Sequence, residues 1–330
     1  MSDTLLAMLD DRLRAQRQDF DSIPVIDISG IRDGSDRETA ARGMNWALAN
    51  TGFMYVKGHG VPEALIDGTF AAARDFFAQP DAVKMPLHIT KSGQALRGYT
   101  ELFGENTNPG VTRDFKECFD IGIEYDGLTG PFHGRNQWPD MPGFKDTLSA
   151  YLDAMLATAR TVLEGIAVSL DLPHDYFAEK MKQPVMIQRL LHYPSQAGQI
   201  DESMIGIGAH TDYGLMTILA QDDVGGLQVM NRSGQWVEAP PIPGTFVVNI
   251  SDLVQRLTND AYLANLHRVV NTSGRQRYSM PCFVDCDIDA VIEPLPSCVT
   301  EAAPLAYAPV QCGMHKMSRY AATFPHLAAE

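Results

Sequence analysis

The chain lacks most features that mark secreted, membrane-spanning or zinc-binding proteins. It has five cysteines in 330 residues, an odd number, and none of them forms a Cys-x-x-Cys pair. A disulfide framework or a structural zinc site is therefore not indicated. No run of about 18 apolar residues occurs, and the start, MSDTLLAMLDDRLRAQRQDFDS, lacks the apolar core of a signal peptide. We expect reduced cysteines, no membrane partner and a cytoplasmic location.

Positive charge is also scarce. The chain has 26 lysines and arginines against 41 aspartates and glutamates, a formal net charge of -15. A protein that binds nucleic acid concentrates basic residues against the phosphate backbone, so this balance argues against a nucleic-acid partner. The hydrophobic content of 45% is enough for a large core. We expect a globular protein with a small-molecule substrate; the sequence does not indicate an oligomeric state.

The first half of the chain contains most of the helical patterns. Apolar residues recur every three or four positions in residues 35–50, with Ser35 as the expected N-cap, in residues 62–80, and in the longest pattern, residues 144–173. Short β-branched runs at SIPVIDISG and GFMYVKGHGV predict two early strands. We predict a mixed helical and strand region over residues 1–140, then a spine helix, a catalytic core and a C-terminal tail over residues 141–330, all within one compact unit.

From residue 185 onward the pattern changes to that of strands. Runs such as VMIQRLLHYP, GGLQVMN, TFVVNIS and RYSMPCF are short and are bounded by Gly, Pro, Asn or Asp. Many short strands at such spacing favour a closed or double-sheet all-β unit, for example a jelly roll. The sequence therefore predicts a mainly β core with flanking helices.

One histidine and one aspartate stand two residues apart in GIGAHTDYGLM. Residues i and i+2 of a strand point to the same face, so His210 and Asp212 can reach one metal ion. The spacing fits equally well two polar side chains on a half-exposed strand. A second histidine, His267 in LANLHRVVN, supplies the third member of a two-histidine, one-carboxylate set, which holds non-haem Fe(II) and leaves coordination positions open. We therefore interpret all three as metal ligands at a catalytic centre.

An arginine and a serine follow at strand spacing in RQRYSMPCF. Arg277 and Ser279 share one face of the predicted strand. A guanidinium binds a carboxylate through two parallel hydrogen bonds, and a hydroxyl beside it adds a third. The pair suits the anchoring of an acid, although a surface arginine and an ordinary strand serine fit the same pattern.

Ten segments follow one another along residues 23–325: IPVIDIS, NTGFMYVKGHGVP, RGYTELFGE, KECFDIG, NQWP, RLLHYP, GAHTDYGLMTILAQDDVGGLQV, LHRVVN, RYSMPCF and GMHKMSRYAATFP. In this order they resemble the isopenicillin N synthase-like family of 2-oxoglutarate and Fe(II)-dependent dioxygenases. The resemblance implies a double-stranded β-helix (jelly roll) with Fe(II) on His210, Asp212 and His267. It also implies 2-oxoglutarate on the metal, with its far carboxylate held by Arg277 and Ser279.

The segment RLLHYP contains a match to the family pattern and a departure from it. Tyr193 matches the tyrosine that many members place beside the co-substrate. Leu191 stands where the plant-type pattern has asparagine, so that contact is lost or replaced, with Arg189 as the candidate replacement. Phe283 is a candidate substrate wall or a core residue. Tyr99 and Phe103 are candidates for a lid over the substrate or for simple packing.

The activity implied by the resemblance is that of an oxidoreductase of secondary metabolism. Such an enzyme consumes 2-oxoglutarate and O2, releases succinate and CO2, and hydroxylates, desaturates or cyclises a small molecule. Alternatives are an Fe(II) oxidase of the same fold that uses no 2-oxoglutarate, an ethylene-forming type of activity, and a binding protein that has lost activity. The substrate is not predicted by the sequence.

Overall fold

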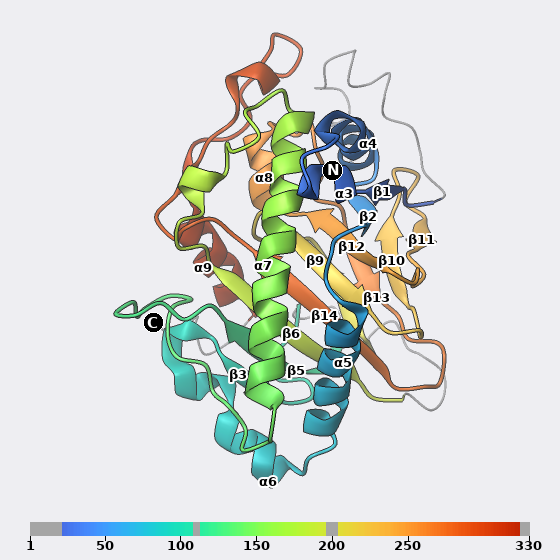
Figure 1. Cartoon of the computed structure of the whole chain (residues 1–330), viewed down its shortest axis with the longest axis vertical. Coiled ribbons are helices and arrows are strands. Elements are labelled where there is room, and N and C mark those ends of the chain that lie inside the picture. Colours follow the sequence, from blue (N-terminus) through green and yellow to red (C-terminus); the bar gives the residue numbers. More distant parts are fainter. Residues whose placement is uncertain (1–21, 108–112, 196–203, 324–330) are drawn as a thin grey trace.

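The computed structural model describes residues 22–107, 113–195 and 204–323. Within these ranges two β-sheets face one another, and helices cover the outer side of the larger sheet (Figure 1). The segment before residue 22 and the last two residues of the family-like tail, 324–325, lie outside the described ranges. The predicted mainly β core with flanking helices and a spine helix is confirmed.

The larger sheet has eight strands. In spatial order they are β1 (Val25–Asp27), β2 (Phe53–Lys57), β12 (Thr245–Ile250), β9 (Met216–Gln221), β14 (Arg277–Val284), β6 (Met186–Tyr193), β5 (Glu117–Gly122) and β3 (Gly98–Thr100). The smaller sheet has four, in the order β11 (Trp236–Glu238), β10 (Leu227–Met230), β13 (His267–Val269) and β8 (Ile207–His210). Two short pairs join β4 (Arg113–Asp114) to β7 (Met204–Ile205) and β15 (Val291–Ile292) to β16 (Val310–Gln311).

The helices lie mainly before the jelly-roll strands and at the C-terminal end. The α-helices are α3 (Ser29–Arg32), α4 (Arg37–Asn50), α5 (Glu63–Phe77), α6 (Asp81–Lys84), α7 (Phe144–Ser169), α8 (Asp252–Leu257) and α9 (Cys312–Thr323). Short 3-10 turns are formed by Met85–Leu87, Ile89–Ala95, Ala178–Lys180 and Pro296–Cys298. Of the helices in the described ranges, none combines the length and apolar character needed to cross a membrane.

The N-cap of α4 differs from the predicted one. Asp36, not Ser35, accepts the hydrogen bond from the backbone N–H of Thr39, at 3.0 Å. The Ser35 hydroxyl instead donates to Asp33. Aspartate and serine are both good N-caps, and here the carboxylate stands at the position from which it reaches the first turn.

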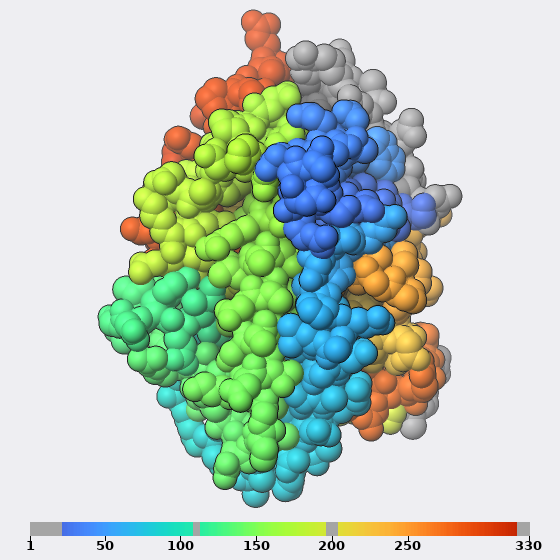
Figure 2. All heavy atoms as spheres, viewed as in Figure 1, coloured from blue at the N-terminus to red at the C-terminus, as the bar shows by residue number. Residues whose placement is uncertain are grey.

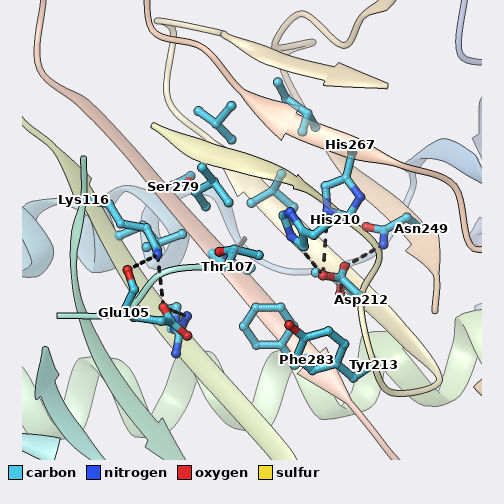
Figure 3. A pocket seen from close by; sticks show the side chains of 18 of the residues that line it. Glu105, Thr107, Lys116, His210, Asp212, Tyr213, Asn249, His267, Ser279 and Phe283 are labelled. Atoms are coloured by element: carbon cyan, nitrogen blue, oxygen red, sulfur yellow. Dashed lines mark hydrogen bonds and ion pairs between the residues drawn. The ribbon is translucent and has the colours of Figure 1, made fainter. Parts of the chain in front are cut away.

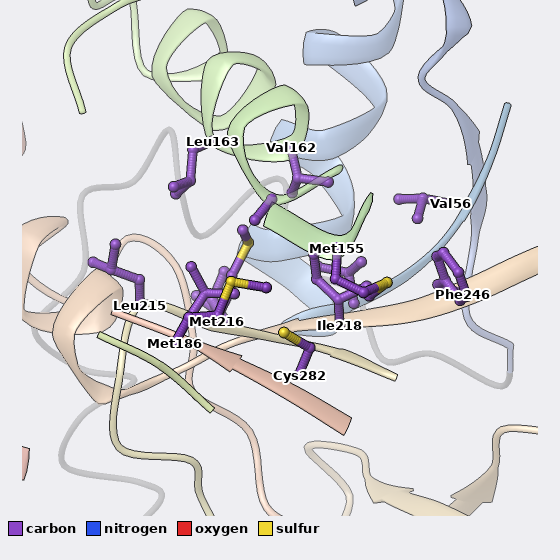
Figure 4. Close-up of a cluster of buried hydrophobic side chains, with 14 of the residues drawn as sticks. Val56, Met155, Val162, Leu163, Met186, Leu215, Met216, Ile218, Phe246 and Cys282 are labelled. Atoms are coloured by element: carbon purple, nitrogen blue, oxygen red, sulfur yellow. The ribbon is translucent and has the colours of Figure 1, made fainter. Parts of the chain in front are cut away.

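The spine helix α7 packs its apolar face on the larger sheet. Met155, Val162 and Leu163 of α7 point toward Met216 and Ile218 of β9 (Figure 4). Burying each such side chain contributes roughly 1.5–3 kcal/mol. In the space-filling view α7 fills the surface between the N-terminal elements and the segment that follows β5 (Figure 2). The helix therefore closes this side of the sheet, and functional side chains belong on the opposite face.

Strand β14 shows how one strand serves both faces. Its residues Tyr278, Met280, Cys282 and Val284 belong to the core beneath the helices. The alternate residues Arg277, Ser279, Pro281 and Phe283 line the cavity on the inner face. This is the two-residue period of an extended strand, which sends successive side chains to opposite sides. Strands β2 and β12, which come from either side of residue 140, pair directly. The division of the chain at that residue remains a prediction.

Candidate active site

Three side chains with metal-binding atoms meet in the cavity between the two sheets (Figure 3). Strand β8 ends at His210 and β13 begins at His267, and these strands pair antiparallel with the two histidines opposite one another. Asp212 follows two residues after His210. One ligand atom from each of the three lies within 4.8 Å of the other two. The three residues singled out in the sequence therefore come together.

The expectation that His210 and Asp212 share one face of a continuous strand is wrong. The strand ends at His210, and Asp212 lies in the following turn, where its carbonyl accepts a hydrogen bond from the backbone N–H of Asp252 at 3.0 Å. The turn brings Oδ1 of Asp212 to 3.6 Å from Nε2 of His210 and 3.7 Å from Nε2 of His267. A turn, rather than the strand period, thus positions the carboxylate.

Backbone carbonyls orient both imidazoles. Nδ1 of His210 lies 2.8 Å from the Gly208 carbonyl, and Nδ1 of His267 lies 3.2 Å from the Asn265 carbonyl. A ring nitrogen that faces a carbonyl carries the proton, so in the neutral ring the other nitrogen keeps its lone pair. Nε2 of each histidine is therefore the atom that can bind a cation in the cavity.

Two neighbouring side chains hold the carboxylate. Oδ2 of Asp212 accepts hydrogen bonds from Oγ1 of Thr217, at 2.5 Å, and from Nδ2 of Asn249, at 2.7 Å. Both donors lie on the larger sheet, in β9 and β12. The other oxygen of Asp212, Oδ1, faces the two histidines. Such outer contacts fix the direction of a metal ligand and tune its basicity.

The charge states of the cluster favour a bound cation. Burial raises the pKa of Asp212, but the neighbouring His267 and His210 and the hydrogen bond from Asn249 outweigh burial and hold that pKa well below its usual value. Burial and the neighbouring His210 lower the pKa of His267 to about 4. The pKa of His210 is raised, because its contact with Asp212 outweighs burial. An ionised carboxylate and a neutral imidazole are the forms that bind metal.

A buried arginine lies in the same cavity. Arg277 is fully buried, and its guanidinium donates to the Gly225 carbonyl at 2.5 Å, to Oγ of Ser279 at 3.0 Å and to Oε1 of Gln221 at 3.1 Å. Its guanidinium carbon lies 4.7 Å from the ring centroid of Tyr193. Across the described ranges, no carboxylate forms an ion pair with it. A buried cation without a directly paired carboxylate is costly, so this arrangement fits an anionic ligand.

A second charged group, here called the Glu105 cluster, contributes Glu105, Lys116 and Arg189 to another part of the cavity wall. Its members are Glu105, Lys116, Arg189, Asp114 and Asp120. Oε2 of Glu105 lies 2.7 Å from Nη1 of Arg189 and 3.2 Å from Nζ of Lys116. Asp120 binds Arg189 through two hydrogen bonds of 2.7 Å, and Asp114 lies 2.9 Å from Nζ of Lys116. The cluster is almost excluded from solvent.

The remaining predicted site residues divide into two groups. Tyr193 and Phe283 line the cavity, and so does Arg189, although its guanidinium is held by Asp120 and Glu105 and lies 5.6 Å from the ring centroid of Phe283. Tyr99 does not form a lid. It lies buried in β3, donates its hydroxyl to Glu117 at 2.6 Å and packs against Phe76.

The lid assignment of Phe103 is not supported either. Its ring lies 5.6 Å from that of Phe115 and 4.2 Å from the guanidinium carbon of Arg113, and it is not among the described residues that line the cavity. Both aromatic residues precede Glu105 in the sequence, and it is Glu105, not either ring, that reaches the cavity.

Several cavity residues were not found from the sequence. Asn249, which is not among the predicted site residues, binds Asp212. Glu105 and Lys116 lie in the glycine-rich loops, and their partner Arg189 is 84 residues from Glu105 along the chain. Tyr213 and, from α9, Lys316 also line the cavity. The position of Asn249 within a buried strand was the one available signal, since a polar side chain buried in a strand needs a partner.

Two family models match the chain. Residues 23–141 match the model described as non-haem dioxygenase in morphine synthesis N-terminal, and residues 184–285 match the 2OG-Fe(II) oxygenase superfamily. The two matches cover the early helices and strands and the jelly-roll strands from β6 to the end of β14. All three residues of the His-Asp-His cluster lie in the second match.

Curated relatives and solved structures of the same kind are similar over most of the chain. Homoarginine-6-hydroxylase 2-ODD-C23 of Glycine max is 37% identical over 305 residues, 86% of this chain and 91% of the relative. The 2-oxoglutarate-Fe(II) type oxidoreductase hxnY of Emericella nidulans is 37% identical over 303 residues, 87% and 86%. The crystal structure of a full-length Neurospora crassa protein in complex with alpha-KG and thymine matches with a TM-score of 0.81 and 32% identity, over 91% and 96% of the two chains.

Proposed function

Because this chain belongs to the isopenicillin N synthase-like family of 2-oxoglutarate and Fe(II)-dependent dioxygenases, we propose that His210, Asp212 and His267 bind its Fe(II). The protein is an oxygenase that acts on small molecules with Fe(II), 2-oxoglutarate and O2. The donor set supports the ligand assignment, since two imidazoles and one carboxylate suit Fe(II) and leave coordination positions open.

We further propose that Arg277 and Ser279 bind the far carboxylate of 2-oxoglutarate. The support is the combination, in one cavity, of a His-Asp-His cluster and a buried guanidinium with no carboxylate partner in the described ranges. A carboxylate there would receive charge-assisted hydrogen bonds from Arg277 and a further one from the Ser279 hydroxyl. Tyr193, whose ring faces the guanidinium, would limit the movement of the arginine.

When bound, Fe(II) supplies the positions at which 2-oxoglutarate and O2 react, and the products are succinate, CO2 and an oxidised substrate. The residues of this chain contribute orientation and shelter. Thr217 and Asn249 hold one carboxylate oxygen of Asp212, so the other would be free to bind the metal. Leu219, Leu227 and Val269 make part of the cavity wall apolar, which excludes water from the co-substrate.

We infer hydroxylation as the outcome on the substrate, with desaturation or ring closure as the other outcomes open to the same site. One similar protein is named a homoarginine-6-hydroxylase and a similar solved structure is a complex with thymine, which makes these two compounds the first to test. The absence of nucleic-acid partners and a cytoplasmic location remain predictions. Both rest on the sequence, the first on the net charge of -15.

Succinate release tests the proposed function. Protein reconstituted with Fe(II) without oxygen, then exposed to O2 and 2-oxoglutarate, should form succinate, and a true substrate should accelerate this. The Asp212→Ala variant should lose the iron-dependent formation of succinate. The control variant Asp27→Ala, which removes a surface carboxylate on β1, should retain it. Oxygen consumption with substrate but without succinate would instead favour the oxidase that uses no 2-oxoglutarate.

A further inference from the structure

The Glu105 cluster takes no part in the proposed binding of metal or co-substrate, yet it reaches the cavity. In Figure 3, Glu105 and Lys116 lie on the far side of Thr107 from His210. The side chains of Glu105, Lys116 and Arg189 are 10%, 2% and 7% exposed. Burying several charges in one place is costly unless each is paired. Such a group on a cavity wall therefore requires an explanation in terms of what the cavity binds.

The two cations of the cluster are already neutralised. Arg189 is held by both oxygens of Asp120 and by Glu105, and Lys116 is held by Asp114 and Glu105. Three carboxylates thus face two cations, a formal charge of -1. Arg97, which donates to the carbonyls of Ala95 and Phe132, also interacts electrostatically with Asp120. This wall therefore offers no unpaired cation to an anionic substrate, in contrast to Arg277.

One oxygen of the cluster remains available. Oε2 of Glu105 receives both ion pairs, whereas Oε1 accepts a hydrogen bond from none of the residues in the described ranges. Burial raises the pKa of Glu105, but the charges of Arg189 and Lys116 outweigh burial and keep that pKa below its usual value, so the carboxyl is ionised. An ionised oxygen on a cavity wall is an acceptor for an N–H donor.

Arg189 adds a donor next to this acceptor. Three of its five N–H groups are used by Asp120 and Glu105, and the cation lies 5.6 Å from the ring centroid of Phe283. Its remaining N–H groups can donate to a carbonyl of the substrate. Phe283 provides an apolar surface close to the polar pair.

We propose that Glu105 is a substrate-binding residue and that the enzyme takes nitrogenous substrates whose N–H groups bind Oε1 of Glu105 and whose bound end carries no negative charge. Cyclic ureides and guanidino compounds belong to this class, and simple carboxylic acids do not. The inference rests on the proposed function, because it assumes that the substrate occupies this cavity.

Equilibrium binding to protein loaded with Fe(II) and 2-oxoglutarate under anaerobic conditions tests the proposal. The probes are thymine as an uncharged N–H compound, homoarginine as a cationic guanidino compound, and benzoate as a carboxylate. Wild-type protein should bind at least one of the two nitrogenous probes more tightly than benzoate. Glu105→Gln should weaken that binding roughly tenfold or more, the effect of removing an ionised acceptor. Glu105→Asp, which keeps the charge, should retain part of the preference.

The matched control is Glu101→Gln, four residues earlier in the same loop, where the half-exposed carboxylate binds His88. This variant should leave every dissociation constant unchanged. Benzoate bound as tightly as the nitrogenous probes, failure of both nitrogenous probes to bind, or unchanged constants in Glu105→Gln would each overturn the proposal. The visible absorption of the Fe(II) and 2-oxoglutarate complex distinguishes a failure of this proposal from a failure of the proposed function. Its presence in Glu105→Gln shows a folded, loaded site, and its absence in wild-type protein refutes the proposed function itself.

Discussion

Asn249 donates from Nδ2 to Oδ2 of Asp212 at 2.7 Å, on the oxygen that does not face the histidines. The amide and the carboxylate lie 37 residues apart in the chain, in β12 and in the turn after β8. Because one carboxylate oxygen is held by this contact, the other has a fixed direction. The metal cluster thus depends on a residue that is not itself a ligand.

Replacement of this amide should weaken iron binding without unfolding the protein. We expect Asn249→Ala to raise the dissociation constant for Fe(II) about 10- to 100-fold, the usual effect of losing an outer partner of a ligand. Titration of metal-free protein with Fe(II) under anaerobic conditions measures it. The control is Asn45→Ala, which removes a side-chain hydrogen bond between α4 and the Ser169 carbonyl at the end of α7, outside the cavity. Equal affinities of the Asn249→Ala variant and wild-type protein would contradict the positioning role.

Replacement of Arg277 should act on 2-oxoglutarate rather than on iron. Arg277→Ala removes the buried guanidinium, so the dissociation constant for 2-oxoglutarate should rise by two orders of magnitude or more, at about 1.4 kcal/mol for each tenfold change. Ser279→Ala removes one hydrogen bond to the carboxylate and should cost about 1.5 kcal/mol, or roughly tenfold. Calorimetric titration with 2-oxoglutarate, after iron loading, gives both values. An unchanged dissociation constant for 2-oxoglutarate in Arg277→Ala would exclude an anchoring role for Arg277.

A carboxylate in the core should make stability depend on pH. Glu117 accepts contacts from Lys84 at 2.8 Å, Tyr99 at 2.6 Å and His192 at 2.7 Å. Burial raises its pKa, but these hydrogen bonds outweigh burial and lower it below the usual value. The stabilisation is complete above the pKa of an unfolded glutamate, about 4.3, and is lost as the pH falls through the lower folded pKa.

Glu117→Gln should therefore lower the free energy of unfolding at pH 7 by about 3 kcal/mol, because buried Lys84 loses its nearest carboxylate and keeps the exposed Asp81, at 3.6 Å. Denaturant unfolding at a series of pH values measures the difference from wild-type protein. That difference should narrow below about pH 4. If the difference in the free energy of unfolding between the variant and wild-type protein stays constant down to about pH 3, the charge of Glu117 does not stabilise the fold.

The cysteines should differ in reactivity by burial. Burial raises the pKa of Cys118 to about 12, and Cys282, Cys286 and Cys312 are also buried, while Cys298 is partly exposed. Since only the thiolate reacts readily, iodoacetamide at about pH 8 should modify Cys298 first in the folded protein. All five should react after denaturation. Mass spectrometry of the alkylated peptides identifies the sites, and early labelling of Cys118 would conflict with this packing.

The sequence predicted the parts of the site that depend on local pattern. The alternation along one strand put Arg277 and Ser279 on one face and left Phe283 open between a substrate wall and the core, and all three line the cavity. His210, Asp212 and His267 were grouped by residue type; strand pairing brings the two histidines together, and the turn after β8 adds Asp212. The cysteines were expected to be reduced, and all five are free.

The parts that depend on tertiary contacts were not predictable in the same way. Nothing near Glu105 in sequence indicates that Arg189 and Lys116 meet it, because β5 and β6 must first pair to bring Asp120 opposite Arg189. For Tyr99 the sequence leaves a lid and simple packing open, and pairing of β3 with β5 places it in the core. The position of Asp212 likewise depends on tertiary contacts, namely its hydrogen bonds with the backbone of Asp252 and the side chain of Asn249.

The central claim is that His210, Asp212 and His267 hold the Fe(II) to which 2-oxoglutarate binds. Anaerobic titration of metal-free protein with Fe(II) in the presence of 2-oxoglutarate, followed by visible charge-transfer absorption, tests it most directly. Wild-type protein should develop the absorption at one iron per chain, and His210→Ala should develop none while remaining folded by circular dichroism. Full absorption in His210→Ala, with wild-type affinity, would contradict the account.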